Sequence, residues 1–299
     1  MSKASIAIIG LNGFLGAPVV AAINSGLFDD KIAYPIKAIT RKEPAEKSDK
    51  IEYIVVDVST ESVESIVAKL GHVDTFVELI SPNPDVFAKI EDLVGALKPK
   101  LFIPSQFGTD IPAVDTYAPG FLGIKTKHAD AVRKLGIKVV DVVTSLFAAP
   151  GAFLYEWVAA LGANVEDKTV TVVGDINQKF HISKLEDIAN TVLALATNPD
   201  PQSLPDVVRV ASDVVTPKIV IDTYSKNHGG VEFKTVSEKT AEEGKQEFAE
   251  ALGRGFEKEK FFWYLQVIVA QGLDKGLYFS KLDNELVNPG ESVWKWGKW

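Results

Sequence analysis

The chain holds 299 residues, of which 46% are hydrophobic and 24% charged, with a formal net charge of −8 and no cysteine. These proportions are typical of a globular protein with a sizeable core, and the acidic balance gives nucleic acid binding no electrostatic support. The absence of cysteine excludes disulfides, thiolate catalysis and cysteine-bound metals, and we expect no metal site.

The first half of the chain alternates apolar runs with helical patterns. The run SIAIIG at 5–10 predicts a strand buried on both faces. Further strands are predicted at 34–40, 51–59, 73–80, 99–108 and 138–147, and helices at 14–26, 62–71, 86–98 and 122–136. This alternation is typical of βαβ units and predicts an α/β fold with a doubly wound parallel sheet of the Rossmann type.

The pattern becomes less regular after about residue 150. Strands are predicted at 168–174 and 206–212, and helices at 186–197, 247–256 and 261–273. We therefore expect an NADP-binding Rossmann domain over 1–150. A smaller α+β lobe over 151–299 should mainly bind substrate, with some segments returning to the first domain.

The two ends of the chain carry different signals. The tail SVWKWGKW at 292–299 holds three of the five tryptophans and can serve as a lid, an interface or a packed terminus. The N-terminal apolar run is too short to span a bilayer and is interrupted by glycine, and no other stretch looks transmembrane. We expect a cytoplasmic monomer or homodimer that binds neither membrane nor nucleic acid.

A glycine-rich loop directly follows the first predicted strand and opens a helix. Its G-x-x-G-x-x-G spacing lets the first glycine make a tight turn, the second admit a pyrophosphate and the third pack helix on strand. The helix N-terminus itself attracts phosphate. We predict dinucleotide contacts from six loop residues: Gly10, Asn12, Gly13, Phe14, Leu15 and Gly16.

The end of the second strand indicates which dinucleotide binds. NAD requires an acidic residue there, but the sequence reads Arg41 and Lys42, with no carboxylate before Glu43. Arg41 can clamp a 2′-phosphate bidentately and Lys42 can add a second charge. The pattern favours NADPH, with two solvated cations as the alternative.

Two later strand ends are expected beside the same cofactor. Asp57 ends the third strand, where the loop passes the adenine, although a role in a helix N-cap region with Ser59 and Thr60 is equally compatible. Ser81 follows the fourth strand, which should border the nicotinamide, either in direct contact or as part of a loop.

The helix predicted at 122–136 carries Lys125, Lys127 and His128. The two lysines project about 200° apart, one on each flank of the apolar stripe, so the helical pattern does not choose between them, and a lysine on a helix is usually solvated. His128 points nearer the centre of the stripe, where a packed or hydrogen-bonded histidine is more common than a catalytic one.

Together these motifs resemble those of atypical short-chain dehydrogenases of the NmrA-like group, on the isoflavone reductase and phenylcoumaran benzylic ether reductase side. The resemblance spans roughly residues 5–190 and rests on GLNGFLG at 10–16, TRK at 40–42, FIPSQFG at 102–108, the lysine helix, LFAA at 146–149 and HISKLEDIANTVL at 181–193. The family pattern F-x-P-S-E-F-G has a glutamate where this chain has Gln106. No catalytic tyrosine is assigned, because the Y-x-x-x-K pattern fails at Tyr117, which Phe121 follows four residues later.

The resemblance implies that NADPH is bound and that hydride passes to a small aromatic or conjugated metabolite. It singles out Lys125, eleven residues before Gly136, as the acid/base beside the cofactor. It also adds Gln106 and Phe147 to the residues expected at the cofactor, with the core as the alternative place for Phe147.

The sequence leaves alternatives for the substrate pocket and for the function. We expect the substrate pocket to include Phe153, Tyr155, Trp157 and the aromatic run at 261–264. An aromatic stripe at helical spacing is more often core than pocket, so none of that run is named as a site residue. One rival function is a catalytically silent NmrA-like NADP(H) sensor that binds a protein partner. Another is an isomerase or dehydratase that keeps the cofactor as a structural prop. Silent relatives usually lose the lysine, so its presence favours an enzyme.

Overall fold

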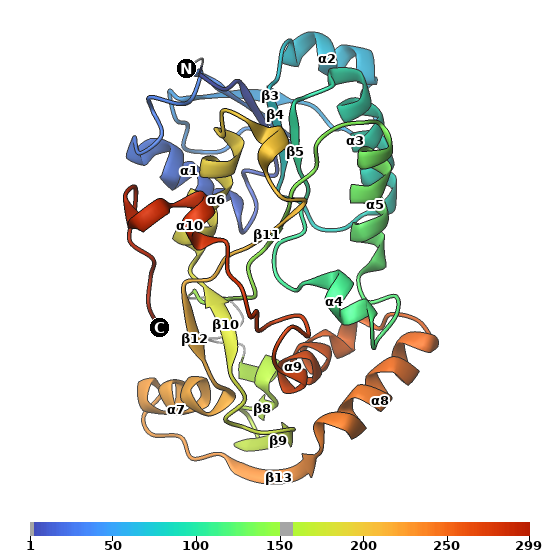
Figure 1. The fold of residues 1–299 in the computed structure, drawn as a ribbon, viewed down its shortest axis with the longest axis vertical. Helices are drawn as coiled ribbons and strands as arrows, with labels where there is room; N and C mark the ends of the chain where they lie inside the picture. Colours follow the sequence, from blue (N-terminus) through green and yellow to red (C-terminus); the bar gives the residue numbers. More distant parts are fainter. Residues whose placement is uncertain (1–2, 150–157) are drawn as a thin grey trace.

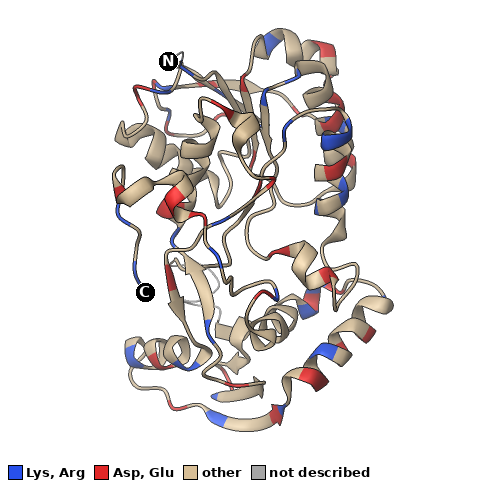
Figure 2. Cartoon of the chain, in the orientation of Figure 1, with Lys and Arg blue, Asp and Glu red and all other residues tan. Residues whose placement is uncertain are grey.

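The structure is a computed structural model that describes residues 3–149 and 158–299. It has two lobes, and the chain crosses between them more than once (Figure 1). The first lobe surrounds a parallel sheet, and the second combines short strands with three helices. Charged residues of both signs are interspersed along the helices on the face that Figure 2 shows.

A five-stranded parallel sheet forms the centre of the first lobe, in the order β3-β2-β1-β4-β5. Its strands are β1 (Ile6–Ile9), β2 (Ile36–Thr40), β3 (Ile51–Val55), β4 (Thr75–Glu78) and β5 (Leu101–Ile103). Every residue of β1, β4 and β5 is buried, as a strand covered on both faces requires. The predicted Rossmann-type α/β fold is confirmed.

Helices cover both faces of this sheet. On one side lie α1 (Gly16–Ser25) and α6 (Leu185–Ala196); on the other lie α2 (Val63–Leu70), α3 (Pro84–Leu97) and α5 (Gly123–Lys134) (Figure 1). A hydrophobic core lies on each face of the sheet, because successive side chains of a strand point to opposite faces. Ile6 and Ile8 pack on the α1 side, while Ala7 and Ile9 pack on the α3 side.

The single strand predicted at 138–147 is wrong, because the segment forms two strands in two sheets. They are β6 (Asp141–Val143), which pairs with β11 (Val207–Arg209), and β7 (Leu146–Phe147), which pairs with β10 (Phe180–Ser183). The break falls at Ser145, whose φ of 57° is left-handed and cannot continue a strand. The chain thereby turns from the first lobe into the second.

The second lobe is built on two three-stranded sheets. One has the order β12-β10-β7, with β12 at Asp213–Val215; the other has the order β13-β9-β8, with β8 (Ala163–Asn164), β9 (Thr169–Val173) and β13 (Lys234–Lys239). Its helices are α7 (Pro217–Asn227), α8 (Ala241–Gly253) and α9 (Phe261–Gln271). Their shared core includes Phe121, Phe248 and Tyr264.

Several short elements complete the described chain. Two short helices are α4 (Ile111–Asp115) and α10 (Asn284–Val287), and four 3-10 turns lie at Val158–Leu161, Pro201–Ser203, Lys258–Lys260 and Pro289–Glu291. None of the helices in the described ranges is long and apolar enough to cross a membrane.

The tryptophan tail is a packed terminus, one of the three uses that its sequence left open. After α9 the chain returns to the first lobe (Figure 1). There Trp294 and Trp296 are buried in the core on the α1 side, with ring centroids 5.3 Å apart, and Trp294 lies 6.4 Å from Phe28. The tail therefore stabilises the first lobe, although it follows the second in the sequence.

Candidate functional site

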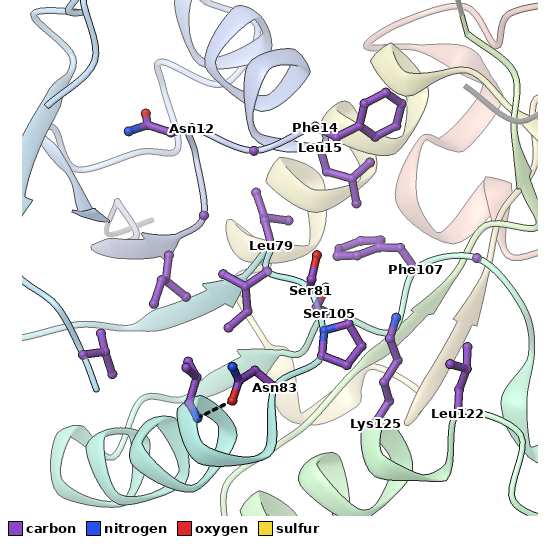
Figure 3. Close-up of a pocket in the computed structure, with 18 of the residues that line it drawn as sticks. Asn12, Phe14, Leu15, Leu79, Ser81, Asn83, Ser105, Phe107, Leu122 and Lys125 are labelled. Atoms are coloured by element: carbon purple, nitrogen blue, oxygen red, sulfur yellow. Dashed lines mark hydrogen bonds between the residues drawn. The ribbon is translucent and has the colours of Figure 1, made fainter. Parts of the chain in front are cut away.

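A cavity of about 940 Å³ lies at the carboxyl edge of the parallel sheet and reaches the second lobe. Its lining starts at residues that follow β2 and β3, crosses the glycine-rich loop and the end of β4, and finishes at β7, α5 and α9. Figure 3 shows the glycine-rich loop on one side and α5 on the other. The crevice at the carboxyl ends of the strands is where α/β sheets bind their ligands.

The glycine-rich loop is shaped by close backbone contacts. Gly10 has a φ of 100°, and a Cβ there would lie 2.5 Å from the Leu79 carbonyl oxygen. A Cβ on Gly16 would lie 2.2 Å from the Leu11 carbonyl oxygen, so only glycine lets α1 start so close to the loop. Gly10 and Gly13 line the cavity, whereas Gly16 packs behind it.

The first turn of α1 faces the cavity without a negative partner. The residue before the helix, Leu15, provides no capping side chain, and the first turn contains no acidic residue. Leu15 and Phe14 line the cavity. The positive end of the helix dipole is therefore available to an anion.

One end of the cavity carries a guanidinium group. Arg41 lines it together with Asp57 and Ser59, whereas Lys42 is not among the lining residues. Asn12 lines the cavity as well, and its side-chain amide donates to Thr40 Oγ1 at 2.8 Å and to the Lys42 carbonyl oxygen at 2.9 Å. The turn that carries Arg41 is thereby tied to the glycine-rich loop.

Asp57 lies beside the cavity and binds its own loop, whereas the N-cap of α2 is Ser62. Asp57 lines the cavity, and its Oδ1 accepts hydrogen bonds from the backbone N and the Oγ of Ser59 at 2.9 and 2.6 Å. These hydrogen bonds hold the pKa of the carboxyl below its usual value, and Arg41 adds a smaller electrostatic contribution. The exposed carboxylate is thus ionised and directed at its own loop.

The middle of the cavity is bordered by aromatic rings and the loop after β4. The rings of Phe14 and Phe147 stack with centroids 6.2 Å apart and planes 26° apart, which joins the glycine-rich loop to β7. Both rings line the cavity, although Phe147 also packs against the first-lobe core. Ser81 and Pro82 line the opposite wall.

Lys125 enters the other end of the cavity from the first turn of α5, as Figure 3 shows. Ser105, Phe107, Thr109 and Leu122 line the cavity there. Burial lowers the pKa of the Lys125 ammonium to about 8, and the negative charge of Glu78 opposes this shift. Lys127 is exposed and does not line the cavity, so the two lysines have different surroundings.

His128 is packed and hydrogen-bonded, as its place on the apolar stripe predicts. It is 3% exposed and stacks on Phe87 with ring centroids 4.1 Å apart. Its Nδ1 lies 2.8 Å from Glu91 Oε1, and its Nε2 lies 3.2 Å from Glu78 Oε2. Nothing in the sequence pattern indicated these two acidic neighbours, because they come from α3 and β4.

Some residues that the sequence singled out do not line the cavity. Gln106 is buried but does not line the cavity, whereas its neighbours Ser105 and Phe107 do. Tyr117 donates from its hydroxyl to the Lys275 carbonyl oxygen at 2.7 Å and is not a lining residue. The side chains expected in the substrate pocket at 153, 155 and 157 lie outside the described residues.

The aromatic run at 261–264 divides between the cavity lining and the core. Phe261 and Leu265, one turn apart on α9, both line the cavity beside Lys125, whereas Tyr264 is fully buried. Helical spacing indicated an apolar face but not that the first turn of this helix would border the cavity of the other lobe.

Comparisons with known proteins match this architecture. A family model described as the NmrA-like family matches residues 2–263. No curated protein matches the chain in sequence.

Three solved structures illustrate the similarity of fold. One comes from work on pinoresinol-lariciresinol and phenylcoumaran benzylic ether reductases, with a TM-score of 0.67, 18% identity and coverage of 92% of this chain and 90% of that one. Another is a leucoanthocyanidin reductase–NADPH complex from Vitis vinifera (0.64, 18%, 90% and 87%). A third is a nucleoside-diphosphate-sugar epimerase from Staphylococcus aureus (0.64, 17%, 95% and 95%). At these identities the likeness concerns the fold alone.

Proposed function

The chain belongs to the NmrA-like family, and we propose that it is an NADPH-dependent reductase of a small aromatic or conjugated metabolite, with Lys125 as its acid/base. The observation that carries the proposal is the single cavity surface that joins the glycine-rich loop, Arg41 and a lysine whose pKa is lowered to about 8. These features are what a dinucleotide and a proton transfer require.

The residues present fit NADPH. Gly10 and Gly13 present no side chain to the cavity, and α1 starts behind them without a capping carboxylate, so a pyrophosphate can approach. Arg41 supplies a guanidinium for a 2′-phosphate. The structurally similar leucoanthocyanidin reductase is a complex with NADPH, which supports the same cofactor here. When bound, NADPH supplies the hydride.

Lys125 then supplies the proton. With a pKa near 8, its ammonium is populated at neutral pH and can be deprotonated without a strong base. As the substrate accepts a hydride, the ammonium gives one proton to the substrate oxygen or carbanion, and the neutral amine recovers a proton from solvent. The substrate thus gains one hydride and one proton in each turnover.

The lining near Lys125 favours an apolar, flat substrate. Phe107, Leu122, Phe261 and Leu265 surround this end of the cavity, with hydroxyl groups at Ser105 and Thr109. Apolar walls with a few polar groups are typical of sites for small organic ligands. Aromatic enones and quinone methides have this shape and accept hydride.

The test is a screen of NADPH oxidation against aromatic enones and quinone methides, combined with binding titrations of NADPH and NADH. We expect tight NADPH binding, weaker NADH binding and turnover with at least one compound class. Tight NADPH binding without any turnover would favour the silent sensor, and turnover without net oxidation would favour an isomerase or dehydratase. The replacement of the family glutamate by Gln106 makes these two outcomes worth measuring. Failure to bind NADPH would overturn the proposal.

A further inference from the structure

A buried acidic and basic cluster lies directly behind the lysine end of the cavity. The Glu78 side chain is fully buried at the end of β4, and its Oε2 accepts a hydrogen bond from the backbone N of Ser105 at 3.1 Å. Ser105 lines the cavity, as Lys125 does. On α5, His128 lies three residues after Lys125 and therefore projects from the same side of the helix. Glu78 thus lies between the cavity wall and the helix that carries the lysine.

The geometry of His128 assigns its charge. Both ring nitrogens face carboxylates, Glu78 at 3.2 Å and Glu91 at 2.8 Å, while Phe87 and Phe102 cover the ring. The contact at Nδ1 is a hydrogen bond, whereas Nε2 meets Glu78 as an ion-pair contact without hydrogen-bond geometry. A neutral imidazole would direct one lone pair at a carboxylate, whereas an imidazolium directs none. A charge this deeply buried requires such partners. The pKa of His128 is raised by the two glutamates against the opposing effect of burial.

Hydrogen bonds compensate the burial of the Glu78 carboxylate only in part. Its Oε1 is buried and, within the part of the chain that the structure describes, has no hydrogen-bond partner. The carboxylate therefore retains charge that acts on its surroundings. The other charged side chains of the cavity lining, Arg41, Asp57 and Asp85, belong to the glycine-loop side and the start of α3. Glu78 is the acidic side chain whose negative charge raises the pKa of Lys125 against the effect of burial.

We propose that Glu78 and His128 are positioning residues for Lys125. His128, held by Glu91, contacts the buried Glu78 carboxylate and fixes its place behind the lysine, where the negative charge favours the protonated, proton-donating form of Lys125. The inference rests on the proposed function only in making Lys125 the proton donor. Beyond the proposed function, two opposing effects act on the Lys125 ammonium: burial disfavours its charged form, and the Glu78 carboxylate favours it.

The experiment follows the reactivity of the Lys125 amine with pH in the intact protein. Pulse acetylation by an N-hydroxysuccinimide ester, read by peptide mass spectrometry, gives the midpoint for Lys125, with exposed Lys127 in the same helix as the internal reference. In the wild-type chain we expect a midpoint near pH 8. In Glu78→Gln it should fall by about one pH unit, the scale of a neighbouring opposite charge, which raises labelling at pH 7 several-fold. An unchanged or higher midpoint would overturn the proposal.

A double-mutant cycle of Glu78 and His128 tests the role of His128. In His128→Gln, which removes the ring that holds the Glu78 carboxylate in place, the Lys125 midpoint should fall toward that of Glu78→Gln; a rise would contradict the positioning role. In the double variant Glu78→Gln/His128→Gln, which leaves no unpaired buried charge, the midpoint should equal that of Glu78→Gln alone. Equal midpoints there would show that His128 acts on Lys125 through Glu78, and a further shift would show a direct effect and contradict the proposal.

The matched control is Asp92→Asn, which removes an exposed carboxylate next to Glu91 on α3 and should leave the Lys125 midpoint unchanged. Labelling needs neither NADPH nor substrate, so a shifted midpoint in a protein without reductase activity would reject the proposed function and keep this inference. In an active enzyme, the alkaline limb of the pH–rate profile should move to lower pH in Glu78→Gln; a limb that stays in place would contradict it.

Discussion

The side-chain amide of Asn12 donates a hydrogen bond to the backbone carbonyl oxygen of Lys42 over 2.9 Å. The same nitrogen donates to Thr40 Oγ1 over 2.8 Å, and Thr40 Oγ1 in turn donates to the Lys42 carbonyl oxygen over 2.7 Å. These bonds close a small network around the turn that presents Arg41. The glycine-rich loop and the proposed 2′-phosphate site are therefore held in one arrangement before a ligand binds, which lowers the entropic cost of binding.

Asn12→Ala removes both of its hydrogen bonds and releases the turn. We expect the dissociation constant for NADPH to rise about fivefold, since a hydrogen bond of this kind contributes about 1 kcal/mol. Fluorescence titration with NADPH measures the change. Asn24→Ala is the matched control, because it loses a hydrogen bond from Ser48 on the other side of α1, outside the cavity. Equal affinities for wild type and Asn12→Ala would show that the network does not position Arg41.

Arg41→Ala separates the two dinucleotides. Because a bidentate contact to phosphate is charge-assisted, its loss should weaken NADPH binding about tenfold or more and leave NADH binding nearly unchanged. Lys42→Ala should have a smaller effect on NADPH, since Lys42 does not line the cavity. Calorimetric titration of both variants with both dinucleotides decides this. A larger loss in Lys42→Ala would reverse the assignment.

Lys125→Met keeps the apolar stem of the side chain and removes the amine. We expect kcat to fall by about 10² to 10⁴, the usual contribution of a general acid, with NADPH binding retained. In the wild-type enzyme the donor is the ammonium, which is populated below a pKa of about 8, so reduction should be constant at lower pH and decline as pH rises through about 8. Lys127→Met should behave as wild type. Wild-type turnover in Lys125→Met would remove Lys125 from the mechanism.

His181 predicts how stability depends on pH. It is 4% exposed on β10, its Nδ1 accepts a hydrogen bond from the Phe279 backbone N at 3.1 Å, and burial lowers its pKa to about 4. The unfolded chain protonates this side chain near pH 6.5, so its contribution is complete above that pH and decreases as pH falls toward 4. The free energy of unfolding should drop by up to about 3 kcal/mol over this range from this group alone.

Urea unfolding of wild type and His181→Gln at pH 7 and pH 4.5 measures this contribution. The variant should lose less stability than wild type between the two pH values. His72→Gln, which removes a histidine from the surface, controls for the change in composition. Parallel losses in wild type and His181→Gln would contradict the prediction.

The fold of the first lobe was predictable because its signals are local. Apolar runs such as 5–10 and the helix at 86–98 each specify their own element, and the glycine spacing specifies the turn between β1 and α1. The break at Ser145 was not predictable, because KVVDVVTSLF is rich in valine and has no glycine or proline, and pairing with β10 and β11, both later in the chain, divides it. The strand β13 was missed for a similar reason: five of its six residues are exposed, so it lacks an apolar pattern.

The candidate site likewise combines residues that local sequence signals indicate with residues that only tertiary packing brings together. Arg41 and the glycines lie where strand ends predict them, because parallel strands bring their carboxyl ends to one edge. The choice between Lys125 and Lys127 depends on which flank of α5 faces the cavity, and the helix period alone does not contain that information. Phe261 and Glu78 reach the site through tertiary packing from α9 and β4, without a local motif that marks them.

A crystal structure of the chain with NADP⁺ tests most directly whether the cofactor extends from Arg41 to Lys125. We expect the 2′-phosphate at Arg41, the pyrophosphate against Gly10 and Gly13, and the nicotinamide C4 facing the Lys125 amine with room for a substrate between them. A nicotinamide at the Arg41 end, or one at the other end with the Lys125 amine turned away from C4, would contradict it.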